Sequence, residues 1–383
     1  MKLREILSFV PREKLIEFGM EYKVDNQVKK LHGEVMFYLL LFSSLNVREN
    51  SLRTLEQFYS SAAFTGLFDK KIEKAKYNSI SDRLRTINVN YFKSIFECVF
   101  EKYASKYLSK KDNIISFDST TVTLSSKLLK EGIKVGSSDN VKGVKYSVAF
   151  SGVPIMSKVF RERIYASEEV ALKELILDCP LSKDNILLFD MGIQSRASFD
   201  EFSDKGLNFI TRAREEVRYV EQSHNSASVG QENERLVIES DLIVKLFNRK
   251  NKETQHDLRL IKCKLKGEDK SLYFLTNNKT YSALEIAELY KRRWEIEVFF
   301  KFLKQHLNFS HLLSRHDNGM QVEMYMALIS AILILVYKKE NNLSGYKIPK
   351  LKMALELESL LMKEIVILCG GDPDKVDDVW APS

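Results

Sequence analysis

The chain is poor in the residues that mark secreted, metal-clustered or disordered proteins. Of its 383 residues, only four are cysteine, six are proline and fifteen are glycine. The cysteines lie far apart and form no Cys-x-x-Cys pair, so we expect thiols of a reducing compartment, and neither a disulfide framework nor a zinc cluster is predicted. So few prolines and glycines leave little room for disorder, and the sequence contains no internal repeat.

Long apolar segments are missing as well. The first residues, MKLREILSFVPREK, lack the apolar core of a signal peptide. The longest apolar run, MALISAILILVY from Met326, is shorter than the roughly 20 residues that cross a membrane, and it predicts a buried helix. We therefore expect a cytoplasmic protein with no membrane partner.

What the chain does have is size and a positive charge. A hydrophobic fraction of 44% over 383 residues predicts a substantial core and two or three folded units. The net charge of +7 fits a polyanionic partner without identifying one.

Residues 1–110 are predicted to form a helical N-terminal domain that binds DNA. Apolar residues recur there at helical spacing in three segments, which are residues 33–45, 49–64 and 78–108. Two short helices with a basic second member fit a helix-turn-helix that enters a DNA groove. A plain helical bundle fits the same pattern, and both interpretations stay open.

The pattern changes near residue 111 from helices to strands. Residues 111–215 predict the order strand, strand, strand, helix, strand, helix, strand, and residues 216–275 alternate like antiparallel strands. Ser282 and Glu285 have the spacing of a capping box that opens a helix within residues 276–340. The fold class is therefore α/β with a mixed sheet. The helical residues 341–383 fit either a dimer contact or packing on the core.

Two aspartates stand out among the predicted strands. Asp118 lies between Phe117 and β-branched residues, which is a poor choice for a strand, and Asp190 ends the apolar strand NILLFD. If the two strands are neighbours, both carboxylates meet at one edge of the sheet. Adjacent like charges need a cation, and carboxylate oxygens suit Mg²⁺ or Mn²⁺. Since a strand-end aspartate also forms turns, either role is open for Asp190.

A third acid lies in the segment LYKRRWEIEVFFKFLKQHL, which we predict to be one helix. Tyr290, Arg293, Glu297 and Lys304 fall within about 60° of one another around such a helix. Apolar residues take up most of its circumference, so Glu297 is expected to face partners and not bulk water. A metal ion and a phosphate backbone would be such partners, and a third carboxylate completes a two-metal site for in-line phosphoryl transfer.

These residues are similar to the Tyr-Arg-Glu-Lys motif of the insertion-sequence-four family of DDE transposases. The segments FDSTTV and LLFDMGIQSRASFDEFSDKGLNFITRAR resemble the first and second aspartate regions of that family, and the resemblance covers most of the chain. It implies a ribonuclease-H-like catalytic domain that a β-rich insertion interrupts, preceded by an all-helical domain. The catalytic core would then comprise residues 111–215 and 276–340, and the insertion residues 216–275.

The resemblance also implies an activity, which is cut-and-paste transposition by end nicking, a hairpin intermediate and strand transfer. Asp118, Asp190 and Glu297 would be the catalytic residues and would bind two Mg²⁺ ions, for which Mn²⁺ may substitute. The partners would be double-stranded DNA of the element's ends and target, with the protein a nucleoid-associated homodimer. The predicted contacts to DNA phosphates are Tyr290, Arg293, Lys304, Lys291, Arg292 and Lys145.

The chain departs from the family pattern at a few positions. Many relatives place arginine, glycine and an aromatic residue after the second aspartate, where this chain has Met191, Gly192 and Ile193. Tyr219 and Trp294 are conceivable partners for a flipped base, although core packing is the favoured role for Trp294. Two other functions remain open, a catalytically silent or domesticated DNA-binding protein and a nuclease of the same fold without strand transfer.

Overall fold

The computed structural model describes residues 9–46, 51–66, 68, 72–108, 113–125, 132–134, 141–307, 309, 312–368, 370–373 and 375–376. The chain forms two compact units. The helical unit comprises Met1–Leu108 and Lys301–Ser383, and the sheet unit comprises Ser109–Phe300.

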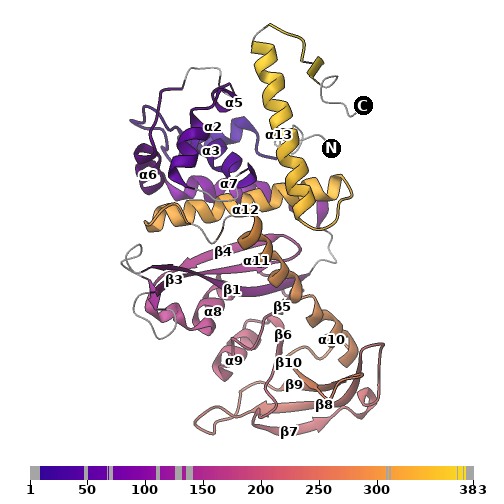
Figure 1. Ribbon diagram of the computed structural model, residues 1–383. Coiled ribbons are helices and arrows are strands. Elements are labelled where there is room, and N and C mark those ends of the chain that lie inside the picture. The colour runs from indigo at the N-terminus through magenta and orange to yellow at the C-terminus, as the bar shows by residue number, and fades with distance from the viewer. Residues whose placement is uncertain are drawn as a thin grey trace. The chain divides into compact units, whose positions relative to one another are not determined.

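The helical unit is built around one long apolar helix, α12 (Figure 1). Every residue of α12 from Met324 to Tyr337 is buried, so the prediction of a buried helix here is confirmed. Among the described residues α12 alone is long and apolar enough to cross a membrane, and 89% of its apolar window is buried, as in a core helix. The helices of this unit are α2 (Arg12–Glu21), α3 (Gly33–Asn46), α4 (Leu52–Tyr59), α5 (Ala62–Thr65), α6 (Tyr77–Thr86), α7 (Val89–Tyr107), α12 (Asp317–Glu340) and α13 (Lys347–Leu368).

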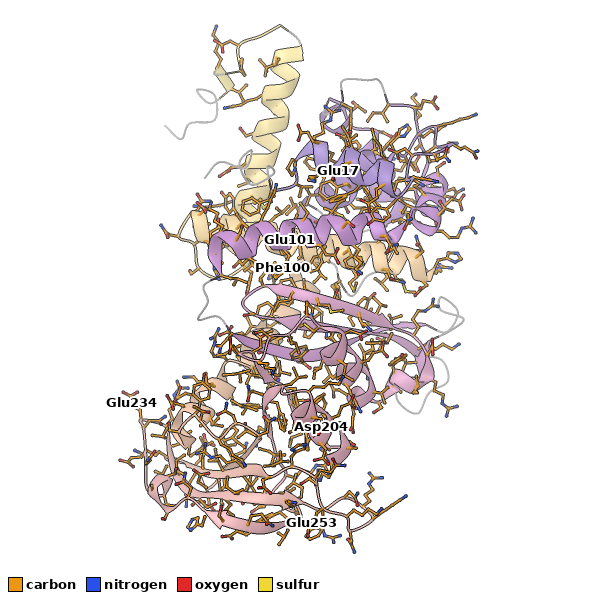
Figure 2. The ribbon with its side chains drawn as sticks, turned by 180° about the vertical axis from the view of Figure 1, so that it is seen from behind. Glu17, Phe100, Glu101, Asp204, Glu234 and Glu253 are labelled. Atoms are coloured by element: carbon orange, nitrogen blue, oxygen red, sulfur yellow. The ribbon has the colours of Figure 1, made fainter. Side chains whose placement is uncertain are left out.

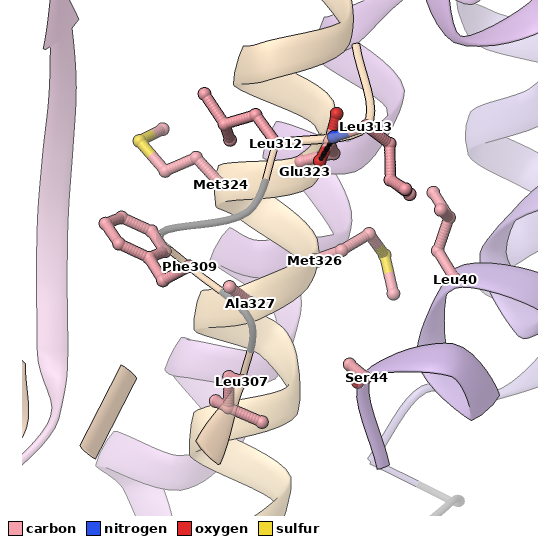
Figure 3. A pocket seen from close by; sticks show the side chains of 10 residues that line it. All are labelled: Leu40, Ser44, Leu307, Phe309, Leu312, Leu313, Glu323, Met324, Met326 and Ala327. Atoms are coloured by element: carbon pink, nitrogen blue, oxygen red, sulfur yellow. Dashed lines mark hydrogen bonds between the residues drawn. The ribbon is translucent and has the colours of Figure 1, made fainter. Parts of the chain in front are cut away.

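An acid inside this unit has a structural role. Glu323 of α12 lines a small cavity and accepts hydrogen bonds from the amides of Leu313 and Ser314, at 2.8 and 2.7 Å (Figure 3). Burial raises the pKa of Glu323 to about 8. Two backbone donors would otherwise lack partners, so Glu323 fixes the segment before α12.

The sheet unit contains one mixed sheet. Its strand order is β2-β3-β1-β5-β6-β10-β9-β8-β7, and β4 also pairs with β3. β1 is parallel to β5 and β5 to β6, while β3 is antiparallel to both β1 and β4. The strands are β1 (Ile114–Ser125), β2 (Ile133–Lys134), β3 (Val141–Phe150), β4 (Pro154–Phe160), β5 (Ile186–Leu188), β6 (Asn208–Arg212), β7 (Tyr219–His224), β8 (Leu236–Leu246), β9 (Leu258–Leu265) and β10 (Ser271–Thr276).

Helices cover both faces of this sheet. Side chains alternate between the two faces along β1. Ile115 and Phe117 belong to one apolar cluster, together with residues of α8 (Glu168–Asp178) and α9 (Arg196–Asp204). Ile114 belongs to the cluster on the other face, together with residues of α10 (Ala283–Lys291). Of the cysteines that the structure describes, Cys179 and Cys263 are buried, one in each cluster, and Cys98 of α7 is half-buried. Burial on both faces explains why β5 reads as a continuous apolar run.

Strands β7 to β10 extend the same sheet, and polar contacts join this part of the unit to the rest. Asp241 and Arg259 form a buried pair with two bonds of 2.7 Å between β8 and β9. Nε2 of His256 lies 2.6 Å from Oδ1 of Asp204, a residue at the end of α9. Asp204 is labelled in Figure 2. Asp200 of α9 also accepts the amide of His256. These bonds fix the β8–β9 connection against the core.

The segment with the third acid differs from the prediction because it is not one helix. The Ser282–Glu285 capping box is present, as predicted, but α10 ends at Lys291 and α11 (Trp294–His306) begins after a turn. At the turn the amide of Arg293 bonds to the carbonyl of Tyr290 at 3.0 Å, which is a tighter i→i−3 pattern. The helical repeat of 3.6 residues is interrupted between α10 and α11. The angle of about 60° that was predicted for Tyr290, Arg293, Glu297 and Lys304 on one helix therefore does not apply.

Candidate active site

The two aspartates lie at the same level of neighbouring parallel strands. Ser116 of β1 pairs with Leu188 of β5, and Asp118 and Asp190 follow two residues later. A separation of two residues keeps a side chain on the same face, and neighbouring strands lie about 4.8 Å apart. The condition that the two strands are neighbours is therefore met, and the two carboxylates lie at one edge of the sheet.

The third strand adds a cation that the sequence reasoning missed. Leu188 pairs with Ile210 of β6, so Arg212 lies level with Asp190 on the same face. Nε of Arg212 is buried and has no hydrogen-bond partner among the described residues. Period-two alternation in NFITR, aligned with NILLFD, would have placed this arginine beside the acid.

Each aspartate uses one oxygen for a local hydrogen bond. Oδ1 of Asp118 accepts the amide of Ser119, and Oδ1 of Asp190 accepts the amide of Gly192, both at 2.7 Å. Asp190 therefore does form a turn. The second oxygen of each carboxylate accepts no hydrogen bond from any described residue, so both are available to a ligand.

The environment of Asp118 disfavours its charged form. Burial, together with the negative charges of Asp190 and Glu168, raises the pKa of Asp118 to about 7. The amide of Ser119 and the charge of Arg293 act in the opposite direction. A bound cation would reverse this balance by favouring the carboxylate.

The third acid, Glu297, is bonded to Arg293 one turn earlier, and the Arg293 side chain is only 14% exposed. The guanidinium also lies over the ring of Tyr290, with 5.7 Å between Cζ and the ring centre. Tyr290 itself is buried against Phe274. Arg293 lies within electrostatic reach of Asp118 as well, so one cation links the helix acid to the strand acid.

The other predicted phosphate contacts lie in varied settings. Lys291 and Arg292 are at the surface, in ion pairs of 3.8 Å with Glu288 and 3.3 Å with Glu295. Such exposed pairs are weak and exchange easily for phosphate. The other two predicted contacts, Lys145 and Lys304, differ from each other in burial. Lys145 is buried and donates to the carbonyl of Ala166 at 2.9 Å, and Lys304 is exposed on α11 within the helical unit.

Trp294 is not a core residue, so core packing as its favoured role was wrong. Its side chain is 61% exposed, and Val298 one turn further along α11 is 38% exposed. The apolar residues Ile296, Phe299 and Phe300 of the same helix are buried, as expected. The helix thus has one solvent face, and it begins at the residue next to Arg293.

A second residue that the sequence reasoning missed is the acid Glu168, the first residue of α8. Its side chain lies next to Asp190, and burial together with the charge of Asp190 raises the pKa of Glu168. In the sequence, Glu168 and Glu169 show only the acidic first turn that is common in helices. The signal that could have been used is the strand order, because a crossover helix starts at the sheet edge where parallel strands end.

The residues present fit a hard divalent cation. Asp118, Asp190 and Glu168 offer carboxylate oxygens of the kind such ions prefer, and a Cβ on Gly192 would contact the side chains of Asp190 and Glu168. Nε of Arg293 is buried and has no hydrogen-bond partner among the described residues. No three acids, histidines or cysteines in the described part of the chain already surround a common point. Glu297 is held by Arg293, so it would have to change partner to bind a metal.

Comparison with known proteins identifies the family. A protein-family model with the description "Transposase DDE domain" matches residues 109–333, which is more than half of the chain. The chain therefore belongs to the family of transposases with a DDE domain. This family acts on DNA and is normally dependent on divalent metals.

Three curated proteins give the same picture. "Probable transposase for insertion sequence element IS5377" of Geobacillus stearothermophilus is 24% identical over 281 residues, 70% of each chain. "Putative transposase y4zB" of Sinorhizobium fredii is 26% identical over 159 residues, 41% of this chain and 44% of that protein. "Putative transposase for insertion sequence element IS4SA" of Synechocystis is 40% identical over 58 residues, 15% of this chain and 17% of that protein. The similarity thus spans less than half of two of these three relatives.

Proposed function

We propose that the protein is the transposase of an insertion sequence, and that it moves DNA by cut-and-paste transposition through end nicking, a hairpin and strand transfer. The observation that carries this proposal is the position of Asp118 and Asp190 at one level of parallel strands, on the face that α10 covers. The strand order β4-β3-β1-β5-β6 supports a ribonuclease-H-like core, and β7 to β10 support an insertion before Glu297.

Each side chain has a role in this proposal. Asp118, Asp190 and Glu297 would hold two Mg²⁺ ions, and the bound ions would supply Lewis-acid chemistry for an in-line displacement, by activating the attacking hydroxyl and stabilising the leaving oxygen. Arg293 leaves Glu297 and binds phosphate oxygens, and the Tyr290 hydroxyl donates to the same strand. A backbone phosphate offers Arg293 the charge that Glu297 now supplies, so DNA binding and release of Glu297 favour each other.

The surface residues extend the DNA contact away from the reacting phosphate. Lys291 and Arg292 adjoin Arg293, and Lys304 lies further along α11. Trp294 offers an exposed ring next to Arg293, suited to stacking on an unpaired base during hairpin formation. Lys145 does not contact DNA directly in this proposal. Its ammonium group donates a hydrogen bond to the carbonyl of Ala166 and so positions the start of α8.

A homodimer is part of the proposal, because two DNA ends must be cut together. Helix α13 carries apolar residues that are exposed and share one face, at spacings of three, four and seven. These residues are Ile348, Leu351, Leu355 and Met362, each 44 to 54% exposed. An apolar stripe of this kind on a surface helix supports α13 as the contact between two copies.

The decisive experiment uses the DNA that flanks the gene. Duplexes carrying inverted repeats from that DNA should be nicked with Mg²⁺ or Mn²⁺ and give hairpin and strand-transfer products. Asp118→Asn, Asp190→Asn and Glu297→Gln should each abolish cleavage while end binding persists. Binding without cleavage by the unaltered protein would indicate a silent DNA-binding protein, and cleavage without strand transfer would indicate a nuclease.

A further inference from the structure

The topology brings a fourth acid to the edge of the sheet where the aspartates lie. β4 is antiparallel to β3, which is antiparallel to β1, so β4 and β1 run in the same direction. The short helix after β4 (Arg163–Ala166) and then α8 therefore begin at the edge where β5 ends. Glu168 is the first residue of α8, and Asp190 follows β5.

Gly192 shows how close these two acids are. A Cβ on Gly192 would lie 2.8 Å from Oδ1 of Asp190 and 2.9 Å from Cδ of Glu168. Both atoms lie within 2.9 Å of the same point, so Oδ1 of Asp190 and Cδ of Glu168 are separated by at most twice 2.9 Å. This distance lets one divalent ion, whose bonds to carboxylate oxygens measure about 2.0–2.6 Å, bridge the two groups. Glycine at position 192 leaves the space open.

The neighbouring residue Glu169 makes the position of Glu168 informative. Both glutamates are in the first turn of α8, where a negative charge favours the helix dipole. Glu169 accepts hydrogen bonds from the amide of Ser195 and the hydroxyl of Ser198, at 3.0 and 3.1 Å. The carboxylate of Glu168 forms no hydrogen bond or ion pair with any described residue and lies beside another acid. The helix dipole explains a charge in this turn but not its placement against Asp190.

We propose that Glu168 is a metal ligand of the active site, and that it shares with Asp190 one of the divalent ions that the catalytic acids bind. This inference rests on the proposed function and adds a residue to it. Two adjacent carboxylates are costly without a cation. The nearby Arg293 and Lys145 are occupied by Glu297 and by the carbonyl of Ala166, and Arg212, although level with Asp190, forms no ion pair with Asp190 or Glu168. A site with Glu168 holds an ion before Glu297 has left Arg293. Glu168 and the aspartates thus form the resting site, and Glu297 completes it when DNA binds.

The test measures Mn²⁺ binding by the full chain without DNA, from the loss of the free-ion signal in electron paramagnetic resonance at pH 8. Glu168→Gln should weaken Mn²⁺ binding about tenfold or more, because it removes a ligand charge. Glu169→Gln and Glu162→Gln are matched controls, one from the same helical turn and one exposed before α8, and both should retain the affinity. Thermal melting verifies that each variant is folded. Glu297→Gln should have little effect without DNA.

A second variant gives an independent readout. Gly192→Ala places a methyl group against both acidic side chains and should weaken Mn²⁺ binding in the same direction as Glu168→Gln. Unchanged Mn²⁺ affinity in folded Glu168→Gln would overturn the inference. If Asp190→Asn still weakened binding in that case, the proposed function would stand without Glu168. If neither Asp118→Asn nor Asp190→Asn affected binding, with or without end DNA, the proposed function itself would fail.

Discussion

Arg293 donates a hydrogen bond to the carboxylate of Glu297, the residue one helical turn further along the chain. Each of these side chains is needed elsewhere in the proposed reaction, Arg293 at a phosphate and Glu297 at a metal ion. The pair therefore describes a resting arrangement in which the helix acid is neutralised by its own neighbour. Because the turn at Arg292 and Arg293 separates α10 from α11, a small rotation there would change both partners.

Arg293→Ala should weaken DNA binding and reduce the salt dependence of the binding constant by about one charge. The physical reason is the loss of one cation that releases counterions from the phosphates. Fluorescence anisotropy over a range of salt concentrations measures this slope. Arg249→Ala, an exposed arginine of the β8–β9 connection, is the control and should leave the slope unchanged. An unaltered slope for Arg293→Ala would limit Arg293 to pairing with Glu297.

Metal affinity should depend on pH through Asp118. The pKa of Asp118 is raised to about 7, so below that pH a proton competes with the metal, and Mn²⁺ affinity should fall about tenfold per pH unit. Stability of the metal-free protein should change in the opposite sense. The folded protein binds the Asp118 proton more tightly than the unfolded chain does, in which the pKa of an aspartate is near 4. This contribution to stability is complete below pH 4 and is lost as the pH rises through 7. Asp118→Asn should therefore raise the melting temperature more at pH 8 than at pH 5, and equal shifts would contradict the raised pKa.

Trp294→Ala should reduce hairpin formation about tenfold or more while nicking and thermal stability are retained. Stacking of a base on an aromatic ring contributes about 1–3 kcal/mol, and a side chain that is 61% exposed contributes little to the core. Gel analysis of nicked and hairpin products separates the two steps. Val298→Ala, one turn further along the same exposed face, is the control. Normal hairpin yield from Trp294→Ala would assign the stacking to another residue.

Asp241→Ala should destabilise the sheet unit by about 3–5 kcal/mol, because it leaves the Arg259 charge buried without its partner. Chemical denaturation followed by circular dichroism measures the loss. Replacing both residues, as Asp241→Leu with Arg259→Met, should cost less than the single change. A single variant as stable as the parent would mean that water reaches Arg259.

Leu351→Glu together with Leu355→Glu should convert a dimer to a monomer, because two charges would enter an apolar contact. Sedimentation analysis of the protein bound to end DNA measures the assembly. Lys352→Glu, between these two positions, is the control for the added charge and should leave the dimer intact. A dimer that survives the double change would place the contact elsewhere than on α13.

Much of the sheet unit was predictable because its signals are local. The apolar strand NILLFD, the out-of-place Asp118 and the Ser282–Glu285 capping box are each recorded in a few adjacent residues. The structure confirms the strand and the capping box and places Asp118 within β1. The continuous helix through Arg293 was wrong because no proline or glycine marks the turn there. The enclosure of Trp294 was wrong because a run of apolar residues does not tell which face of a helix lacks a neighbour.

By itself, the sequence determined which residues carry the acids and that two of them end or interrupt apolar strands, because side-chain alternation and strand propensity act over a few residues. Only the tertiary structure decided that Arg212 and Glu168 lie beside Asp190 and that Glu297 is bonded to Arg293. Those relationships depend on strand register and on where a crossover helix starts, and both are set by contacts between segments far apart in the chain.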